Sequence, residues 1–170
     1  MAQVLIIGYG NPLRGDDGLG WHAAQQCAAF LSPTLVNVMA CHQLTPELAE
    51  PISQAGLVIF LDADAQGSPG KLSCRSIVAQ PSDAGVFSHH LTPQTLLACA
   101  QGLYGSSPAA VALSISGACF GYSECLSPAV NAVLPELLQY VRALVTVTER
   151  GVALGVNPCI ARGRGCHSDA

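Results

Sequence analysis

The feature that most constrains this chain is a glycine-rich stretch at residues 8–20, which directly follows a short apolar run at residues 4–7. The apolar run, Val-Leu-Ile-Ile, is typical of a strand buried on both faces of a parallel sheet. Apolar residues then recur at helical spacing, so the sequence predicts a helix that begins near Asp17 or Gly18 and ends at Phe30. The stretch is therefore the loop of a strand-to-helix crossover, and such loops lie at the ligand-binding edge of open α/β sheets.

The glycines of this loop do not complete a nucleotide-binding pattern. Gly8 and Gly10 are correctly spaced after a strand, but Leu13 stands where the dinucleotide fingerprint requires a third glycine. The Gly-Lys-Ser/Thr sequence of a phosphate-binding loop is also missing, and two adjacent carboxylates, Asp16 and Asp17, would repel a pyrophosphate. The sequence therefore disfavours a nucleotide-binding regulator.

Asp16 and Asp17 are the chemically distinctive residues of the loop. One acidic residue in the first turn of a helix satisfies free N–H groups and suits the helix dipole. A single carboxylate is enough for that purpose, which leaves the other free to serve as a hard oxygen ligand or a general base. Spacing alone does not decide whether both residues only cap the helix.

The remaining sequence alternates between strand and helix patterns. This order predicts a three-layer α-β-α sandwich around a mostly parallel sheet of about five strands. We expect one domain over residues 1–149 and a flexible tail over residues 150–170. The further strands are expected near 35–39, 57–61, 72–78 and 110–115, and the further helices near 45–54, 92–101 and 127–145.

Polar residues follow several of these strands. Asp62 ends the apolar run at 57–61, and His42 and Gln43 follow the strand at 35–39. If the first three strands are neighbours, these side chains converge with Asp17 at one edge of the sheet. Carboxylates combined with imidazole form the kind of donor set that binds a transition metal. Two further histidines, His89 and His90, precede the helix that starts at Thr92-Pro93 and are candidate ligands.

Composition excludes several classes of protein. The 170 residues carry a net charge of −4 with 11% charged residues, so the basic patch expected of a nucleic-acid-binding protein is absent. No apolar run reaches the length of a membrane helix and no signal peptide is evident, so we expect a cytoplasmic protein without membrane insertion. The eight cysteines are scattered without a Cys-x-x-Cys pair, which favours reduced thiols.

Five motifs follow one another along the chain. They are Gly8-x-Gly10-Asn11-x-Leu13-x-x-Asp16-Asp17-Gly18-x-Gly20, His42-Gln43-Leu44-Thr45-Pro46-Glu47-Leu48, the strand that ends in Asp62-Ala63, Ser88-His89-His90-Leu91-Thr92-Pro93 with Leu96-Leu97, and Gly117-x-x-Phe120 with Leu126-Ser127-Pro128 and Val130. Taken together and in this order, they resemble the motifs of the [NiFe]-hydrogenase maturation endopeptidases. The resemblance runs from about residue 4 to residue 145.

This resemblance implies an enzyme that removes the C-terminal extension of a hydrogenase large-subunit precursor after nickel insertion. The nickel is carried by the substrate, and no tightly bound cofactor of the enzyme itself is expected. Carried over by motif, the catalytic and nickel-contacting residues are Asp17, Asp62 and His89, with His90 as the alternative ligand if the loop shifts by one residue. Asp16 takes a capping or loop-holding role.

The resemblance also assigns a substrate-binding side to the site, made of Asp16, His42, Gln43 and His90. The partner is the precursor, and we expect the protein to be a monomer. Either Asp17 or Asp62 could be the general base. The alternative function is a nickel-dependent chaperone that binds the precursor without cutting it, because the same ligands would serve both activities.

Overall fold

The computed structural model describes residues 3–81 and 91–151, and within them strands and helices alternate in the predicted order. Two of the helices are preceded by short 3-10 turns, at Gly15–Gly18 and Pro46–Leu48. The elements are β1 (Val4–Tyr9), α1 (Leu19–Phe30), β2 (Val36–Cys41), α2 (Ala49–Ser53), β3 (Leu57–Asp64), β4 (Leu72–Ile77), α3 (Pro93–Tyr104), β5 (Ala109–Ser116) and α4 (Pro128–Glu149).

The five strands form one sheet in the order β2-β1-β3-β5-β4. β1 pairs in parallel with both β2 and β3, and β3 pairs in parallel with β5, whereas β4 runs antiparallel to β5 at one edge. The first three strands are therefore neighbours, as the convergence argument required. Their carboxyl ends lie at the same edge of the sheet, where ligands bind in open α/β folds.

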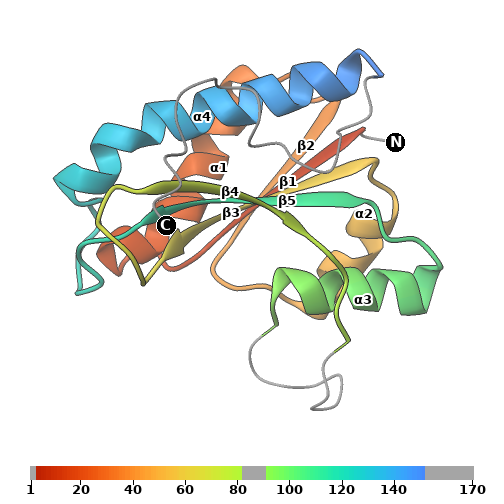
Figure 1. Ribbon diagram of the computed structural model, residues 1–170, viewed down its shortest axis with the longest axis horizontal. Helices are drawn as coiled ribbons and strands as arrows, with labels where there is room; N and C mark the ends of the chain where they lie inside the picture. Colours follow the sequence, from red (N-terminus) through yellow and green to blue (C-terminus); the bar gives the residue numbers. More distant parts are fainter. Residues whose placement is uncertain (1–2, 82–90, 152–170) are drawn as a thin grey trace, which may run out of the picture.

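Helices cover both faces of the sheet, which confirms the predicted three-layer sandwich. α1 and α4 lie on one face, and α2 and α3 lie on the other (Figure 1). Because side chains alternate along a strand, β3 contributes Leu57, Ile59 and Leu61 to the core under α1 and α4, and Val58 and Phe60 to the core on the opposite face.

The long helix α4 has the amphipathic pattern expected of a helix that covers a sheet. Its first residue is Pro128, and the preceding Ser127 side chain accepts a hydrogen bond from the Val130 N–H at 3.4 Å. Its buried residues recur at helical spacing, namely Val130, Leu134, Leu137, Val141, Leu144 and Val145. Within the described ranges, no helix is both long and apolar enough to cross a bilayer.

Four strands extend further than the sequence predicted. β1 continues to Tyr9, β2 to Cys41 and β3 to Asp64, and β5 runs from Ala109 to Ser116. β3 is prolonged because β5 continues alongside it, so that Asp62 pairs with Ser114. Asp62 therefore lies within a strand and not in the loop after it, and its side-chain direction is fixed by the sheet.

The backbones of β1 and α1 approach each other so closely that only glycine fits at their contact. A Cβ atom at Gly8 would overlap the carbonyl oxygen of Gly20. A Cβ atom at Gly20 would overlap the carbonyl oxygens of Tyr9 and Leu61. These two glycines set the height of α1 above the sheet and so position the loop between them.

We expect Gly20→Ala to lower the free energy of unfolding by about 2 kcal/mol or more, because the added methyl group forces α1 away from the sheet. Gly102→Ala is the matched control, since Gly102 lies in α3 and a Cβ atom there would meet no neighbouring atom within 4 Å. There the better helix propensity of alanine should raise the free energy of unfolding by about 0.5 kcal/mol. Urea unfolding of both variants tests this; equal effects would contradict the close-contact argument.

Candidate functional site

Asp17 is held by the folded loop between β1 and α1. The Asn11 N–H donates to Asp17 Oδ2 at 2.9 Å, and Asn11 Oδ1 accepts a hydrogen bond from the Leu13 N–H at 2.9 Å. Gly10 has a φ of 133°, and a Cβ atom there would overlap the Asp17 carbonyl oxygen. The Asp17 carboxylate is half-buried, so part of it remains accessible at the edge of the sheet.

Asp16 has a different role from its neighbour. Its side chain has no exposed surface. Its Oδ2 accepts hydrogen bonds from the N–H groups of Ala118 and Cys119, at 2.7 and 2.9 Å, and its Oδ1 accepts one from Ser127 at 2.7 Å. Burial acts to raise the pKa of Asp16, but these backbone hydrogen bonds outweigh burial and lower it.

These contacts agree with the loop-holding role of Asp16 and correct its assignment to the substrate-binding side. The three backbone donors belong to the chain between β5 and α4, which Asp16 ties to the loop after β1. A carboxylate that is fully buried and already bonded to backbone is not available to a substrate.

Asp62 lies on the face of the sheet that α2 and α3 cover, near the carboxyl end of β3 and beside the start of α3. Its Oδ1 accepts a hydrogen bond from the Ala63 N–H at 2.7 Å. Burial is the main cause that raises the pKa of Asp62 to about 6, and the charges of Asp17 and Asp64 raise it further. Hydrogen bonds from the Tyr9 hydroxyl and Ala63 act in the opposite direction. The influence of Asp17 shows that these two carboxylates share one electrostatic environment.

A small hollow of about 130 Å³ lies beside Asp62. Its wall includes the Arg75 side chain from the edge strand β4 and the Gln94 side chain from the start of α3. The other residues that line it are Tyr9, Ala63, Asp64, Ile77, Pro93, Ala112 and Ser114. The hollow thus lies next to a carboxylate whose pKa burial raises to about 6.

The histidine and glutamine candidates are only partly placed. His42 and Gln43 are exposed immediately after β2, and the Gly10 N–H donates to the Cys41 carbonyl oxygen at 3.2 Å, which brings this strand end against the loop of Asp17. His89 and His90 lie outside the described residues. The choice between them therefore stays a prediction, as does the third ligand.

Within residues 3–81 and 91–151, no three His, Cys, Asp or Glu side chains are grouped closely enough to hold a metal ion. Asp17 and Asp62 offer carboxylate oxygens from two different elements. Carboxylate oxygen and imidazole nitrogen are ligands of divalent transition metals.

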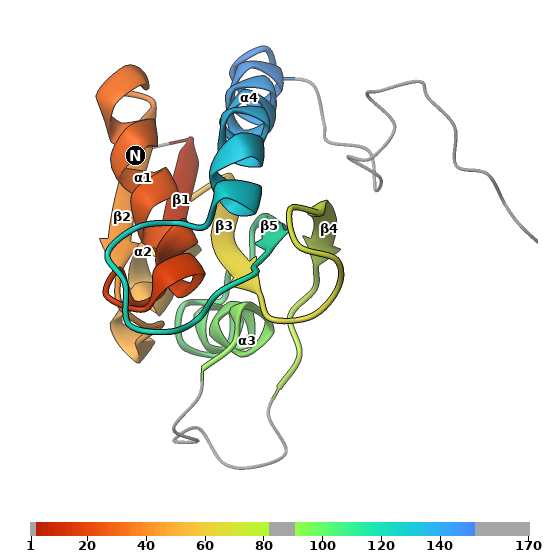
Figure 2. The same cartoon turned by 90° about the vertical axis from the view of Figure 1, so that its left-hand side faces the viewer.

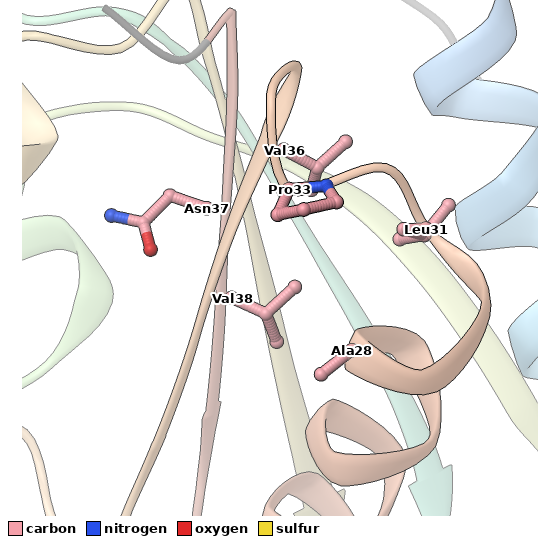
Figure 3. A pocket seen from close by; sticks show the side chains of 6 residues that line it. All are labelled: Ala28, Leu31, Pro33, Val36, Asn37 and Val38. Carbon is pink, nitrogen blue, oxygen red and sulfur yellow. The ribbon is translucent and has the colours of Figure 1, made fainter.

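A second hollow, of about 410 Å³, lies far from these carboxylates, between the end of α1 and the start of β2. Ala28 and Leu31 face it from the α1 side, and Val36 and Val38 face it from β2, whereas the Asn37 side chain points to the other side of the strand (Figure 3). Its walls carry no titratable group, so it offers no chemistry comparable to the edge with Asp17 and Asp62.

Sequence reasoning missed Tyr9 and Arg75. Tyr9 ends β1 on the same face as Asp62, and Arg75 lies opposite Ala112 on the far side of β5. The alternation of β1 could have placed Tyr9 on the side of Leu5 and Ile7. The arrangement of Arg75 depends on the antiparallel register of β4, for which the sequence carries no signal.

The fold is shared with several solved structures. The hydrogenase-maturating endopeptidase HybD from E. coli has a TM-score of 0.69 at 20% identity, over 89% of this chain and 94% of that one. The [NiFe] hydrogenase maturation protease HycI from Thermococcus kodakarensis KOD1 has a TM-score of 0.69 at 20% identity, over 85% and 93%. Hydrogenase 2 maturation peptidase from Thaumarchaeota archaeon SCGC_AB-539-E09 has a TM-score of 0.62 at 24% identity, over 88% and 99%.

No protein-family model and no curated protein matches the chain. The structural likeness covers nearly the whole length of each neighbour, so this chain has their fold. It leaves the activity to be argued from the site.

We expect Asp16→Asn to lower the free energy of unfolding at neutral pH by about 2–4 kcal/mol. The new side-chain NH2 group would face backbone N–H groups whose hydrogen bonds a carboxylate oxygen had accepted, and those donors would lose their partner. The folded state lowers the pKa of Asp16, so its ionised form stabilises the fold above about pH 4 and this contribution is lost as the pH falls further. The difference between wild type and variant should therefore shrink in acid. Chemical unfolding at pH 7 and pH 3 measures both effects.

Asp17→Asn is the matched control for that experiment. Asp17 accepts a hydrogen bond from one backbone N–H and is half-buried, so its replacement should cost about 1 kcal/mol or less. Equal destabilisation by the two substitutions would contradict the division of roles between these neighbouring residues.

Proposed function

We propose that this protein is an endopeptidase that removes the C-terminal extension of a [NiFe]-hydrogenase large-subunit precursor after nickel has been inserted. The observation that supports it most directly is the electrostatic influence of Asp17 on Asp62: Asp17 lies in the loop after β1 and Asp62 near the carboxyl end of the neighbouring strand β3. The fold is that of solved hydrogenase maturation proteases, whose names state this class of activity.

In this proposal the substrate supplies the nickel. Asp17 presents a carboxylate that is fixed by the Asn11 N–H, and Asp62 presents one from β3, the strand paired with β1. Two carboxylates alone bind a divalent metal weakly, so the enzyme engages the nickel only together with ligands from the precursor and a histidine. A precursor without nickel is then refused because it lacks the group that these carboxylates recognise.

Hydrolysis also needs a group that accepts a proton from water. A carboxylate with a pKa near the working pH is an effective general base, and the pKa of Asp62 is raised to about 6 by burial. Asp17 remains the other candidate for this role. A metal ion near the scissile carbonyl would also polarise it, so metal ligation and proton transfer are separate contributions to the reaction.

The test is the intact mass of a nickel-loaded precursor before and after incubation with this protein. We expect loss of a C-terminal peptide from the loaded precursor and none from the nickel-free precursor. Asp17→Asn and Asp62→Asn should each slow processing by about 100-fold or more, because each removes a charged group from the reacting centre. Glu50→Gln, on the exposed side of α2, is the control carboxylate and should leave the rate unchanged.

An unchanged mass together with a stable nickel-dependent complex would replace this proposal by the alternative, a chaperone that binds the precursor without cutting it. Full processing by both aspartate variants would instead show that the site lies elsewhere.

Tyr9→Phe should lower kcat/KM for the loaded precursor by about 10-fold or more. The Tyr9 hydroxyl is a hydrogen-bond partner of the Asp62 side chain, and loss of a group that orients a ligand commonly has an effect of this size. Steady-state kinetics measure the change. Tyr104→Phe, on the exposed end of α3, is the matched control, and equal rates for wild type and Tyr9→Phe would contradict the orienting role.

A further inference from the structure

Two loops that are distant in sequence lie side by side at the edge of the sheet that carries Asp17. We call residues 10–18, between β1 and α1, and residues 117–127, between β5 and α4, the paired loops. Figure 2 shows them next to each other at one end of the molecule. The Gly15 N–H donates to the Ser123 carbonyl oxygen at 2.7 Å, and the Ser123 N–H donates to the Leu13 carbonyl oxygen at 3.0 Å.

The paired loops are fixed against each other by more than this short ladder. The buried carboxylate of Asp16 accepts hydrogen bonds from three N–H groups of the second loop. The Asp16 N–H donates a hydrogen bond to the Cys119 carbonyl oxygen at 2.9 Å. Gly15 has a φ of 54°, and a Cβ atom there would lie 2.7 Å from the same oxygen. A surface held in this way is preorganised, which reduces the entropy lost when a partner binds.

The outer surface of the paired loops exposes two large apolar side chains, Leu13 and Tyr122. Tyr122 is 86% exposed, more than any other large hydrophobic residue in the described ranges, and Leu13 is 42% exposed. The bridge between Arg14 and Ser123 makes Leu13 and Tyr122 neighbours across the two loops. The exposed residues around them are mainly small or apolar, namely Ala118, Cys119 and Cys125, with Arg14 and Glu124 as the charged ones.

We infer that Leu13 and Tyr122 form a docking surface for the folded body of the protein substrate. The inference rests on the proposed function. Leu13 and Asp17 belong to one loop, so a protein that brings its bound metal to the half-buried Asp17 carboxylate must lie against this loop. Exposed tyrosines surrounded by few charges are typical of the residues that contribute most to binding a protein.

Other exposed apolar residues do not share this position. Leu103 and Tyr104, which are 71% and 51% exposed, end α3. Figure 1 shows that α3 ends on the side of the molecule opposite to the paired loops. These residues have the same chemistry but no carboxylate site beside them, which makes them matched controls.

The test is steady-state processing of nickel-loaded precursor by wild type, Leu13→Ser, Tyr122→Ser and the controls Leu103→Ser and Tyr104→Ser. We expect Leu13→Ser and Tyr122→Ser to raise KM, Tyr122→Ser by about 10-fold or more, with kcat unchanged. Binding energy that is equal in the ground state and the transition state gives this pattern. The controls should keep both constants, and all four variants should keep the thermal midpoint because the side chains are exposed.

Three results would overturn the docking surface while leaving the proposed function intact. The first is that Leu13→Ser and Tyr122→Ser leave both KM and kcat unchanged, and the second is that they lower kcat while KM stays unchanged. The third is a concentration-dependent dimer of the wild type that Tyr122→Ser dissociates, since the surface would then join two copies of this chain. Failure of the wild type to process any loaded precursor would instead overturn the proposed function. In that case, affinity for the loaded precursor measured by calorimetry decides the docking surface separately.

Discussion

The site depends on one buried carboxylate. Asp16 joins the loop after β1 to the chain between β5 and α4, because its oxygens accept N–H groups that have no partner in a helix or a strand ladder. Without this carboxylate, three backbone N–H groups would lose their hydrogen-bond partner. The loop that fixes Asp17 would then lose its link to the chain between β5 and α4. The charge is tolerated in the interior because backbone dipoles replace the water that it gives up.

Most of the architecture follows from patterns that are local in the sequence. The apolar runs at β1 and β3, the Thr-Pro and Ser-Pro helix starts and the long amphipathic α4 each depend on residues that are close together in the chain. The adjacency of the first three strands was a condition of the sequence argument, and the strand order β2-β1-β3-β5-β4 meets it. The extent of β3 did not follow from local patterns, because it is decided by pairing with Ser114 and Ser116 on a strand some fifty residues later.

The sequence predicted the aspartates of the site but not the side chains that surround them. The Asp-Asp pair indicated a division between a structural and a functional carboxylate, and the family resemblance gave Asp16 the loop-holding role. The sequence could not name its partners, which are the N–H groups of Ala118, Cys119 and Ser127. Tyr9 and Arg75 entered only through contacts across strands. The histidines of the predicted ligand set lie outside the described residues and remain predictions.

Because Asp62 lies inside β3, the face of the sheet on which its carboxylate lies depends on the alternation of side chains along the strand. Side chains on a strand alternate between two faces, so Asp62 shares its face with Phe60 and Asp64 while Leu61 and Ala63 face the other core. A shift of one residue along β3 would turn the carboxylate toward α4 and an apolar side chain toward Tyr9, with no change in composition. The pairing register of β3 with β1 and β5 therefore determines which face of the sheet carries the Asp62 carboxylate.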